Sequence, residues 1–408
     1  MTTKFFSAAW DCGRWNLMPS EERALLVALE RELADLACRD RLRSLACVPG
    51  VNLYSNDYLG LSENPELKRA LLAGIERTQR VGSTCSRLLS GNAPEWEELE
   101  EEFARFAGTE AALYFSSGYA ANIGLLSAVL RRDDVVFSDE LNHASLIDGI
   151  RLSSARRVVY AHRDVHALER ALEKYHAKRC RKLIVTESIF SMDGDRAPIQ
   201  EILALADRYG AELVVDEAHA TGVHGPAGRG LVAALCAERR VFTVVHTCGK
   251  ALACAGAFVC GAASLRQYLI NRARTFLFST ALPPYFAHQI RAALGLARAM
   301  DLERSALLGN ASNFACALRG AGFDVGATSS QIVPVVLGED AAAVRFSEEL
   351  VRAGFAVRPI RPPTVAEGQS RLRFSFTCRV SAADLGRLRA VLVATRAAAR
   401  PATTARSA

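Results

Sequence analysis

Short apolar runs alternate with amphipathic segments through most of the chain. The runs rich in Val, Ile or Leu are Val135–Ser138, Arg157–Tyr160, Leu183–Glu187, Glu212–Asp216 and Val241–His246. Segments with helical spacing, such as Val165–His176 and Pro198–Tyr209, separate them. This alternation is typical of a mostly parallel sheet that helices cover on both faces, so the pattern predicts an α/β fold. Ligands of such sheets collect at the carboxyl ends of the strands.

An amphipathic segment precedes this pattern. Residues Ser20–Ala46 place five leucines on one helical stripe: Leu25, Leu26, Leu29, Leu33 and Leu36. The spacing predicts a helix in an N-terminal arm over residues 1–48. A second helix is expected over Pro94–Ala107, where Gly108 ends it.

The pattern changes after the turn Leu282–Phe286. A long helical stretch is expected over His288–Leu318, and the elements expected after it are Gln331–Leu337, Ala341–Ala353, Ala356–Ile360, Arg371–Thr377 and a last helix from Ser381. Ser381 with Asp384 resembles a capping box. We therefore expect a large domain over residues 49–290, a smaller C-terminal α/β domain over residues 291–396 and a disordered tail over residues 397–408.

Composition excludes several classes of protein. Half of the 408 residues are hydrophobic, and the net charge of +6 comes from scattered arginines without a basic run, so neither nucleic acid nor a membrane is an expected partner. No stretch has the length and apolarity of a membrane span or a secretory signal. The eleven cysteines show no CxxC spacing, which is typical of reduced thiols, and we expect a cytoplasmic protein.

Lys250 differs from the other lysines of the chain. It follows a β-branched run and lies among Gly, Ala and Cys, whereas the other lysines have polar or charged neighbours. Burial disfavours the ammonium form and lowers the pKa, which makes such an amine a nucleophile toward an aldehyde. From this segment alone, a lysine at a strand end whose amine reaches solvent is the alternative.

A strand-to-helix corner lies within Ala111–Leu130, at Ser116, Ser117 and Gly118. A glycine there lets backbone N–H groups approach an anion, and the start of the helix adds partial positive charge. The corner is therefore a candidate phosphate site, although many such corners hold no ligand.

Asp216 ends an apolar strand, and His219 follows three residues later. A carboxylate there is costly unless it meets a cation, and a protonated pyridine nitrogen is a suitable one. His219 could then donate to the phenolic oxygen of the same ring. The alternatives are an aspartate that caps the next turn and an ordinary core histidine. A metal site with Glu217 is disfavoured because no further His or Cys pair stands at ligand spacing.

Together these features match the three groups by which proteins hold pyridoxal 5′-phosphate (PLP): a lysine for its aldehyde, an aspartate for its ring nitrogen and a helix start for its phosphate. A nucleotide-binding P-loop at Gly249-Lys250 is excluded because Val244 replaces the required glycine and Ala251 the required Ser or Thr.

The chain also resembles a known family, the α-oxoamine synthases, which are fold-type I PLP-dependent transferases. The segments that carry the resemblance are SNDYLGL, GSTCSRLLSGN, YFSSGYAAN, NHASLIDG, TESIFSMDGD, VVDEAHATGVHG, HTCGKALA and FLFSTALPP. They occur in the family's order between about residues 40 and 380. His246 and Cys248 depart from the commoner wording, which bears on packing beside the ring and leaves the functional residue types in place.

The resemblance implies roles for individual residues. Lys250 would be joined to the cofactor, Asp216 and His219 would face the ring nitrogen and phenolic oxygen, and His143 would stack on the ring. As catalytic residues it therefore implies Lys250, His143, Asp216 and His219. The other implied cofactor contacts are Ser117, Gly118, Tyr119, Ser191, Thr247 and Thr280 of the partner subunit. A homodimer with shared active sites follows from the last of these.

Substrate contacts are expected from three further residues. Alternation puts Arg371, Arg373, Ser375 and Thr377 on one face of a strand. Arginine suits a carboxylate, and the resemblance favours Arg373 for the carboxylate of an amino acid. Asn56, in the polar segment SNDYLGL, is a second candidate. Arg43 matches a position expected to meet the acyl substrate, with a surface salt bridge as its alternative.

The resemblance implies a decarboxylative condensation of an amino acid with an acyl thioester on CoA or an acyl carrier protein. The sequences of these segments are most similar to those of members that join L-alanine to a pimeloyl thioester. A sister enzyme that uses glycine or serine with another thioester is the first alternative. A catalytically silent PLP-binding partner subunit is the second, and the presence of Lys250 argues against it.

Overall fold

The structure, a computed structural model, describes residues 23–399. Its largest element is a seven-stranded sheet with the strand order β2-β8-β7-β6-β5-β3-β4. The strands are β2 (Ala111–Phe115), β3 (Val135–Asp139), β4 (Arg156–Tyr160), β5 (Lys182–Glu187), β6 (Glu212–Asp216), β7 (Thr243–Thr247) and β8 (Ala257–Gly261). Strands β3 to β7 pair in parallel, and β8 runs antiparallel to both of its neighbours. This confirms the predicted fold class.

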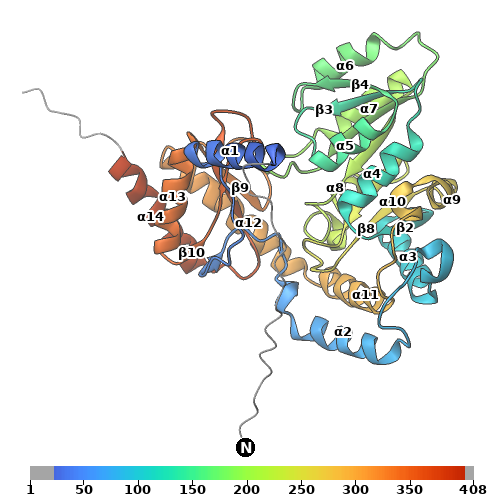
Figure 1. Ribbon diagram of the computed structural model, residues 1–408, viewed down its shortest axis with the longest axis horizontal. Coiled ribbons are helices and arrows are strands. Elements are labelled where there is room, and N and C mark those ends of the chain that lie inside the picture. The colour runs from blue at the N-terminus through green and yellow to red at the C-terminus, as the bar shows by residue number, and fades with distance from the viewer. Residues whose placement is uncertain (1–22, 400–408) are drawn as a thin grey trace, which may run out of the picture.

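Helices cover both faces of this sheet (Figure 1). The helices of this domain are α2 (Pro65–Arg77), α3 (Pro94–Ala107), α4 (Gly118–Val129), α5 (Ala144–Leu152), α6 (Val165–Glu173), α7 (Ile199–Tyr209), α8 (Leu231–Ala234), α9 (Ala263–Arg272), α10 (Arg274–Leu277) and α11 (Tyr285–Arg298). Of these, α2 packs outside the others against α11. Successive strand residues pack on opposite faces: Val136 joins a cluster with α4 and α5, and Phe137 joins one with α6 and α7. Because both faces are buried, the inner strands have apolar centres, whereas the edge strand β4 begins with the exposed Arg156 and Arg157.

A smaller α/β domain follows, and the two domains lie side by side (Figure 1). Its antiparallel sheet has the order β11-β12-β9. Its elements are α12 (Asp301–Gly320), β9 (Ile332–Gly338), α13 (Asp340–Arg352), β10 (Phe355–Ala356), β11 (Pro359–Ile360), β12 (Ser370–Ser375) and α14 (Ala382–Ala399). The capping box is present, since Asp384 N–H donates to Ser381 Oγ over 3.1 Å and Ser381 N–H donates to Asp384 Oδ2 over 3.3 Å.

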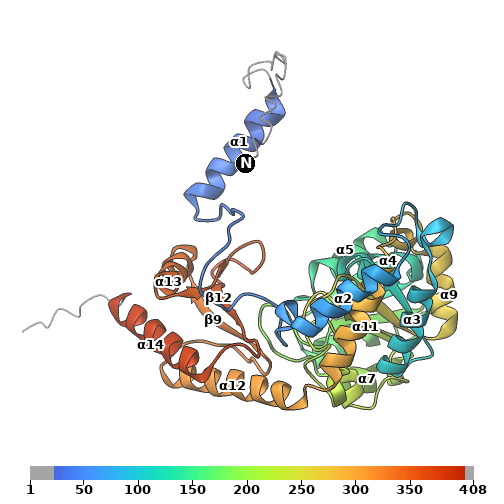
Figure 2. The same ribbon diagram turned by 90° about the horizontal axis from the view of Figure 1, so that it is seen from below.

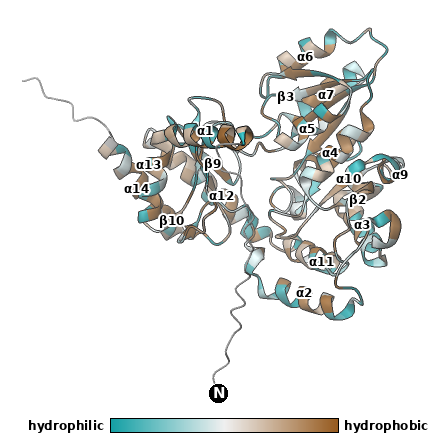
Figure 3. Cartoon of the chain, viewed as in Figure 1, coloured by the Kyte–Doolittle hydropathy of each residue, from teal (hydrophilic) through white to brown (hydrophobic). Residues whose placement is uncertain are grey.

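One apolar core joins the two domains. It contains Trp96 and Phe103 of α3, Ile290 of α11 and Phe314 of α12, together with Phe374 of β12. Figure 3 shows brown, hydrophobic residues on elements of both domains. Helices α11 and α12 therefore connect the domains through packed side chains as well as through the chain itself.

The N-terminal arm includes helix α1 (Ala24–Cys38), shorter than the predicted Ser20–Ala46, whose first residues lie outside the described part of the chain. Figure 2 shows α1 projecting away from both domains. None of its residues is buried, and Leu25, Leu29 and Leu33 are 73%, 47% and 52% exposed. The predicted stripe therefore lacks an apolar partner within residues 23–399.

Several predicted boundaries need correction. Residues Ala299 and Met300 divide the expected long helix His288–Leu318 into α11 and α12, so the predicted boundary at residue 290 falls inside α11. Strand β1 (Val51–Asn52) belongs by sequence to the predicted large domain, yet it pairs with β10 of the small domain. Helix α14 continues to Ala399, past the predicted start of the tail at residue 397. Residues 400–408 lie outside the described residues. In residues 23–399, no helix has both the length and the apolarity to cross a membrane.

Candidate active site

A pocket of about 370 Å³ opens at the carboxyl ends of the central strands. It receives side chains from the ends of β5, β6 and β7 and from the starts of α4 and α5. Of the predicted site residues, these line it: Asn56, Ser117, Gly118, Tyr119, His143, Asp216, His219, Thr247 and Lys250. Residues far apart in the sequence thus meet where parallel strands end, as predicted.

Asp216 lines this pocket and is 4% exposed. Its Oδ1 accepts a hydrogen bond from Ala218 N–H over 2.8 Å, and its Oδ2 accepts one from Asn122 Nδ2 over 2.7 Å. These bonds fix the carboxylate without neutralising it. A cationic ring nitrogen would offset the cost of its burial.

Asn122 of α4 also reaches His143. Its Nδ2 lies 2.9 Å from Ser145 Oγ, which lies 2.7 Å from His143 Nδ1. That Nδ1 also accepts the Ser145 backbone N–H, so in the neutral ring the proton is on Nε2. Burial lowers the pKa of His143, while the carboxylate of Asp216 opposes the shift. His143 is therefore a neutral, oriented ring with one N–H left for a ligand.

Lys250 follows β7 in a short loop closed by backbone bonds. Cys248 N–H donates to Gly256 O over 2.8 Å, and Ala253 N–H donates to Lys250 O over 2.9 Å. Gly256 has φ +94°, and a Cβ there would lie 2.1 Å from the Tyr114 hydroxyl, so the loop requires glycine. Strand β8 returns directly from this loop, which sequence analysis did not predict.

Burial lowers the pKa of the Lys250 amine, and the nearby carboxylates of Asp216 and Glu187 only partly oppose it. A larger fraction of the amine is therefore unprotonated near neutral pH, as a nucleophile or a base requires. This agrees with the prediction that Lys250 is desolvated.

His219 is buried beside the same pocket. Its Nδ1 lies 2.7 Å from the Tyr58 hydroxyl, and its backbone carbonyl accepts a bond from Gln331 Nε2 over 2.7 Å. Burial lowers its pKa well below the ordinary value, and the charges of Lys250 and Arg373 lower it further. His219 is therefore a neutral hydrogen-bonding group held on two sides.

The corner before α4 has the geometry of a phosphate site. Ser117 is the N-cap of this helix, and its Oγ accepts Ala120 N–H over 3.0 Å. Gly118 packs on Thr247, where an added Cβ would lie 2.6 Å from the Thr247 methyl group. The backbone can thus approach a ligand closely at the positive end of a helix of twelve residues.

Two arginines of β12 face the same side, but only Arg371 has an ion-pair partner. Its Nη1 lies 2.6 Å from Asp193 Oδ1. Arg373 instead contacts neutral groups, including the Asn56 amide oxygen over 3.2 Å and the Tyr58 hydroxyl over 3.5 Å. Both are nearly buried. Arg373 is therefore the buried guanidinium that lacks a carboxylate among the described residues.

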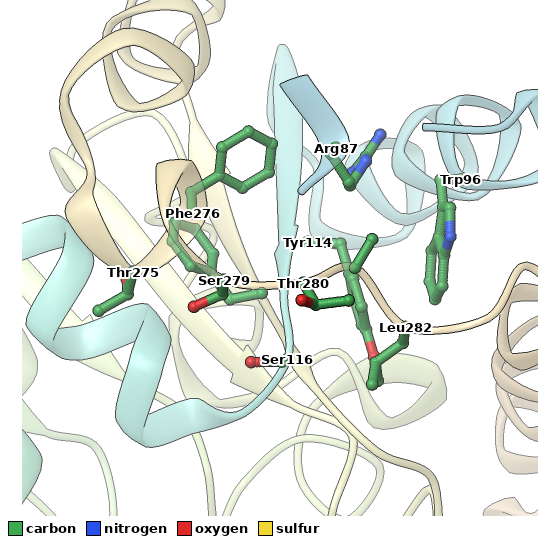
Figure 4. Close-up of a pocket in the computed structure, with 11 residues that line it drawn as sticks. Arg87, Trp96, Tyr114, Ser116, Thr275, Phe276, Ser279, Thr280 and Leu282 are labelled. Carbon is green, nitrogen blue, oxygen red and sulfur yellow. The ribbon is translucent and has the colours of Figure 1, made fainter. Parts of the chain in front are cut away.

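Four predicted contacts do not line this pocket in the single chain: Arg373, Ser191, Arg43 and Thr280. The carbonyl of Ser191 accepts a bond from Arg373. Arg43 binds the Arg361 carbonyl over 3.3 Å and Thr364 Oγ1 over 3.4 Å, which does not match its alternative as a salt bridge. Thr280 lies in a small neighbouring pocket of about 30 Å³ (Figure 4). Ser116 lines both pockets, so Thr280 is close to the phosphate corner without reaching it.

Sequence analysis missed the residues that hold the predicted ones. Asn122 links Asp216 to the support of His143, and Tyr58 links His219 to Arg373. An asparagine inside the apolar helix α4 was the available signal for the first. Glu217, considered for a metal, instead accepts Leu231 and Val232 N–H at the start of α8. His246 is a core histidine whose pKa burial lowers to about 3.

These residues fit PLP. The pocket presents a buried carboxylate without a cation of its own, an amine with a lowered pKa, and a helix start where a glycine leaves room for a phosphate. One oxygen of Glu187, which also lines the pocket, is buried without a hydrogen-bond partner among the described residues. The contacts to the aldehyde, the ring nitrogen and the phosphate of PLP would thus each come from a different element of the large domain.

Comparisons with known proteins agree with this site. A family model described as aminotransferase class I and II matches residues 48–392. The chain is 48% identical over 339 residues to the 8-amino-7-oxononanoate synthase of Geobacter sulfurreducens, which covers 83% of this chain and 86% of the relative. It is 47% identical over 368 residues to that of an Anaeromyxobacter species, with 87% and 92% covered.

Among solved structures, the chain is similar to a serine palmitoyltransferase from S. paucimobilis with PLP and myriocin bound. The TM-score is 0.84 at 28% identity, and the match covers 93% of this chain and 98% of the other. The fold, the pocket and these matches agree on one family and one cofactor, PLP. The chain belongs to the class I and II aminotransferase family and, within it, to the α-oxoamine synthases.

Proposed function

We propose that this enzyme condenses L-alanine with a pimeloyl thioester, on CoA or acyl carrier protein, to give 8-amino-7-oxononanoate, CO₂ and the free thiol in biotin biosynthesis. The observation that carries this is the 47–48% identity to relatives named 8-amino-7-oxononanoate synthase over more than four fifths of the chain. The serine palmitoyltransferase alternative rests on 28% identity and on the shared fold.

The residues of the pocket divide the chemistry among them. When bound, PLP supplies an aldehyde that joins amines and a ring that accepts electrons from Cα. Asp216 stabilises a proton on the ring nitrogen. Lys250, with its lowered pKa, removes and returns the proton at Cα of alanine. Arg373 binds the alanine carboxylate until it leaves as CO₂.

The two histidines act as neutral donors. His143 has Nε2–H available and can stabilise the thioester oxygen as negative charge develops on it. His219 faces the phenolic oxygen of the ring. Both remain neutral because burial lowers the pKa of each. Neither therefore adds a further buried positive charge beside the Arg373 guanidinium.

The proposed enzyme works as a homodimer with shared active sites in the cytoplasm. Thr280 lies beside the phosphate corner of its own chain but outside the pocket, which is compatible with a contact to the cofactor of a second copy. Ten cysteines of the described residues are free thiols, as in a reducing compartment. A solution mass equal to one chain of 44.2 kDa would contradict the dimer.

A substrate-pair assay tests the activity. With purified, PLP-loaded protein, alanine and a pimeloyl thioester on CoA or carrier protein should release CO₂ and thiol. Glycine with acetyl-CoA and serine with palmitoyl-CoA should turn over at least tenfold more slowly, a difference of about 1.4 kcal/mol in transition-state stabilisation. Faster turnover of either control pair would replace the proposal by a sister reaction.

Lys250→Ala tests the silent-subunit alternative in the same assay. It should abolish turnover and the visible absorbance band of the bound cofactor, because the amine that joins the aldehyde is missing. Lys68→Ala, on the exposed face of α2, is the matched control and should change neither. An unchanged band in Lys250→Ala would contradict the role of this lysine.

A further inference from the structure

A second cavity lies away from the active site, between α12 and the segment before β9. Its volume is about 350 Å³, and it shares no lining residue with the pocket of Lys250. Arg196, which follows the loop after β5, contributes to its wall, and Arg319 of α12 lies at its exposed rim. Leu308 and Ala311 supply an apolar side.

The charges in this cavity are unbalanced. Among the described residues, no aspartate or glutamate lines it. Neither arginine forms an ion pair within residues 23–399, whereas other partly buried arginines do, as Arg87 does with Glu100. Arg319 donates to the Gly326 carbonyl over 3.2 Å, and Arg196 Nη2 lies 3.3 Å from His224 Nδ1.

Arg196 has a further unmet requirement. Its Nε is buried and has no hydrogen-bond partner in the part of the chain that the structure describes. Burial lowers the pKa of its guanidinium, and no carboxylate raises it. A desolvated cation with an unused N–H costs free energy that a bound anion would offset.

Four hydroxyl side chains also line the cavity: Ser312, Thr328, Ser329 and Ser330. Ser330 donates its hydroxyl to Gly194 O over 2.7 Å and accepts Ile332 N–H over 3.3 Å, and Thr328 donates its own hydroxyl to Ile332 O, so both hydroxyl protons are used within the protein. Ser312 and Ser329 lie on the exposed side of the cavity, where their hydroxyls can donate. Cations, hydroxyls and an apolar wall together suit a small organic molecule with an anionic group.

We propose that this cavity binds a small organic anion whose phosphate or carboxylate group contacts Arg196 and Arg319. The volume exceeds that of an inorganic ion, and the side of Leu308 and Ala311 would receive the organic part. The site lies outside the predicted substrate and cofactor contacts, and the proposal does not depend on which thioester the enzyme uses.

Isothermal titration calorimetry on the full-length, PLP-loaded enzyme tests this site. Inorganic pyrophosphate represents phosphates and succinate represents carboxylates, each titrated at constant ionic strength. At least one should bind saturably with one site per chain, and the arm that binds identifies the anionic group. Loading with PLP fills the phosphate corner of the active site, so the titration reports on other sites.

Variants locate the binding. Arg196→Gln should weaken it at least tenfold, Arg319→Gln should weaken it less, and Arg196→Lys should retain most of it, because the charge is kept. Arg298→Gln, an exposed arginine of α11 outside the cavity, is the matched charge control and should bind as the wild type does. If Arg196→Gln does not fold, Arg319→Gln with Ser329→Ala tests the same wall.

Two results would overturn the proposal. One is the absence of saturable binding for both probes. The other is an equal loss of affinity in Arg298→Gln and in the cavity variants, which would indicate attraction to the overall positive charge of +6 rather than to a site.

Discussion

Arg371 and Arg373 are two residues apart on one face of β12, yet their surroundings assign them different tasks. Asp193 neutralises Arg371, whereas the hydrogen-bond partners of Arg373 within residues 23–399 are neutral oxygens of Asn56, Tyr58, Ser191 and Ser375. The alternation in the sequence predicted the shared face but not which arginine would stay unpaired, because Asp193 is about 180 positions away in the chain.

This difference predicts that only the substitution of Arg373 changes KM for alanine. Arg373→Gln should raise KM for alanine about tenfold to a hundredfold, since a charge-assisted contact to its carboxylate contributes about 1.5–3 kcal/mol. Arg371→Gln, the matched control, should lower stability and leave KM for alanine within about twofold. Steady-state kinetics with varied alanine measure both. Equal KM values in the two variants would contradict the assignment of Arg373.

At the scale of elements, the sheet and its helices follow from short-range patterns. Strand β6 and helix α3 begin and end where predicted. The spacing of apolar residues and the glycine that ends α3, Gly108, are both local signals. Strand β8 was missed because the glycines and cysteines before it look like a loop. The pairing of β1 with β10 was missed because it joins residues about 300 positions apart.

In the site, too, residues whose roles depend on local sequence were predicted and residues whose roles depend on distant contacts were not. Lys250, Asp216 and Gly118 could be predicted since each carries its chemistry in its own segment. Asn122 and Tyr58 could not, because their roles consist of contacts with other elements.

His162, which follows the edge strand β4, connects the end of β3 with the loop after β5. Its Nδ1 lies 2.9 Å from Asp139 Oδ1 at the end of β3, and its Nε2 lies 3.0 Å from Asp195 Oδ2. Burial alone would lower the pKa of His162, but hydrogen bonds to both carboxylates raise it to about 9.

The raised pKa predicts how stability depends on pH. An unfolded histidine titrates near 6.5, so the bridge contributes fully below about pH 6.5 and is lost as the pH rises toward 9. His162→Ala should therefore lower the free energy of unfolding by about 1–3 kcal/mol at pH 6, with partial exposure favouring the lower end, and by much less at pH 10. Urea unfolding at both pH values measures this, and a pH-independent loss would contradict the charged bridge.

For the whole molecule, the apolar core that α11 and α12 carry from one domain into the other has a thermal consequence. Side chains of both domains share it, so neither half can lose its packing without exposing the interior of the other. Scanning calorimetry should show a single endotherm with no separate melting of the C-terminal half. Two resolved peaks would mean that the halves are only tethered. A catalyst built in this way opens to its substrates by small adjustments of packed surfaces, in the manner of shear rather than of a free hinge.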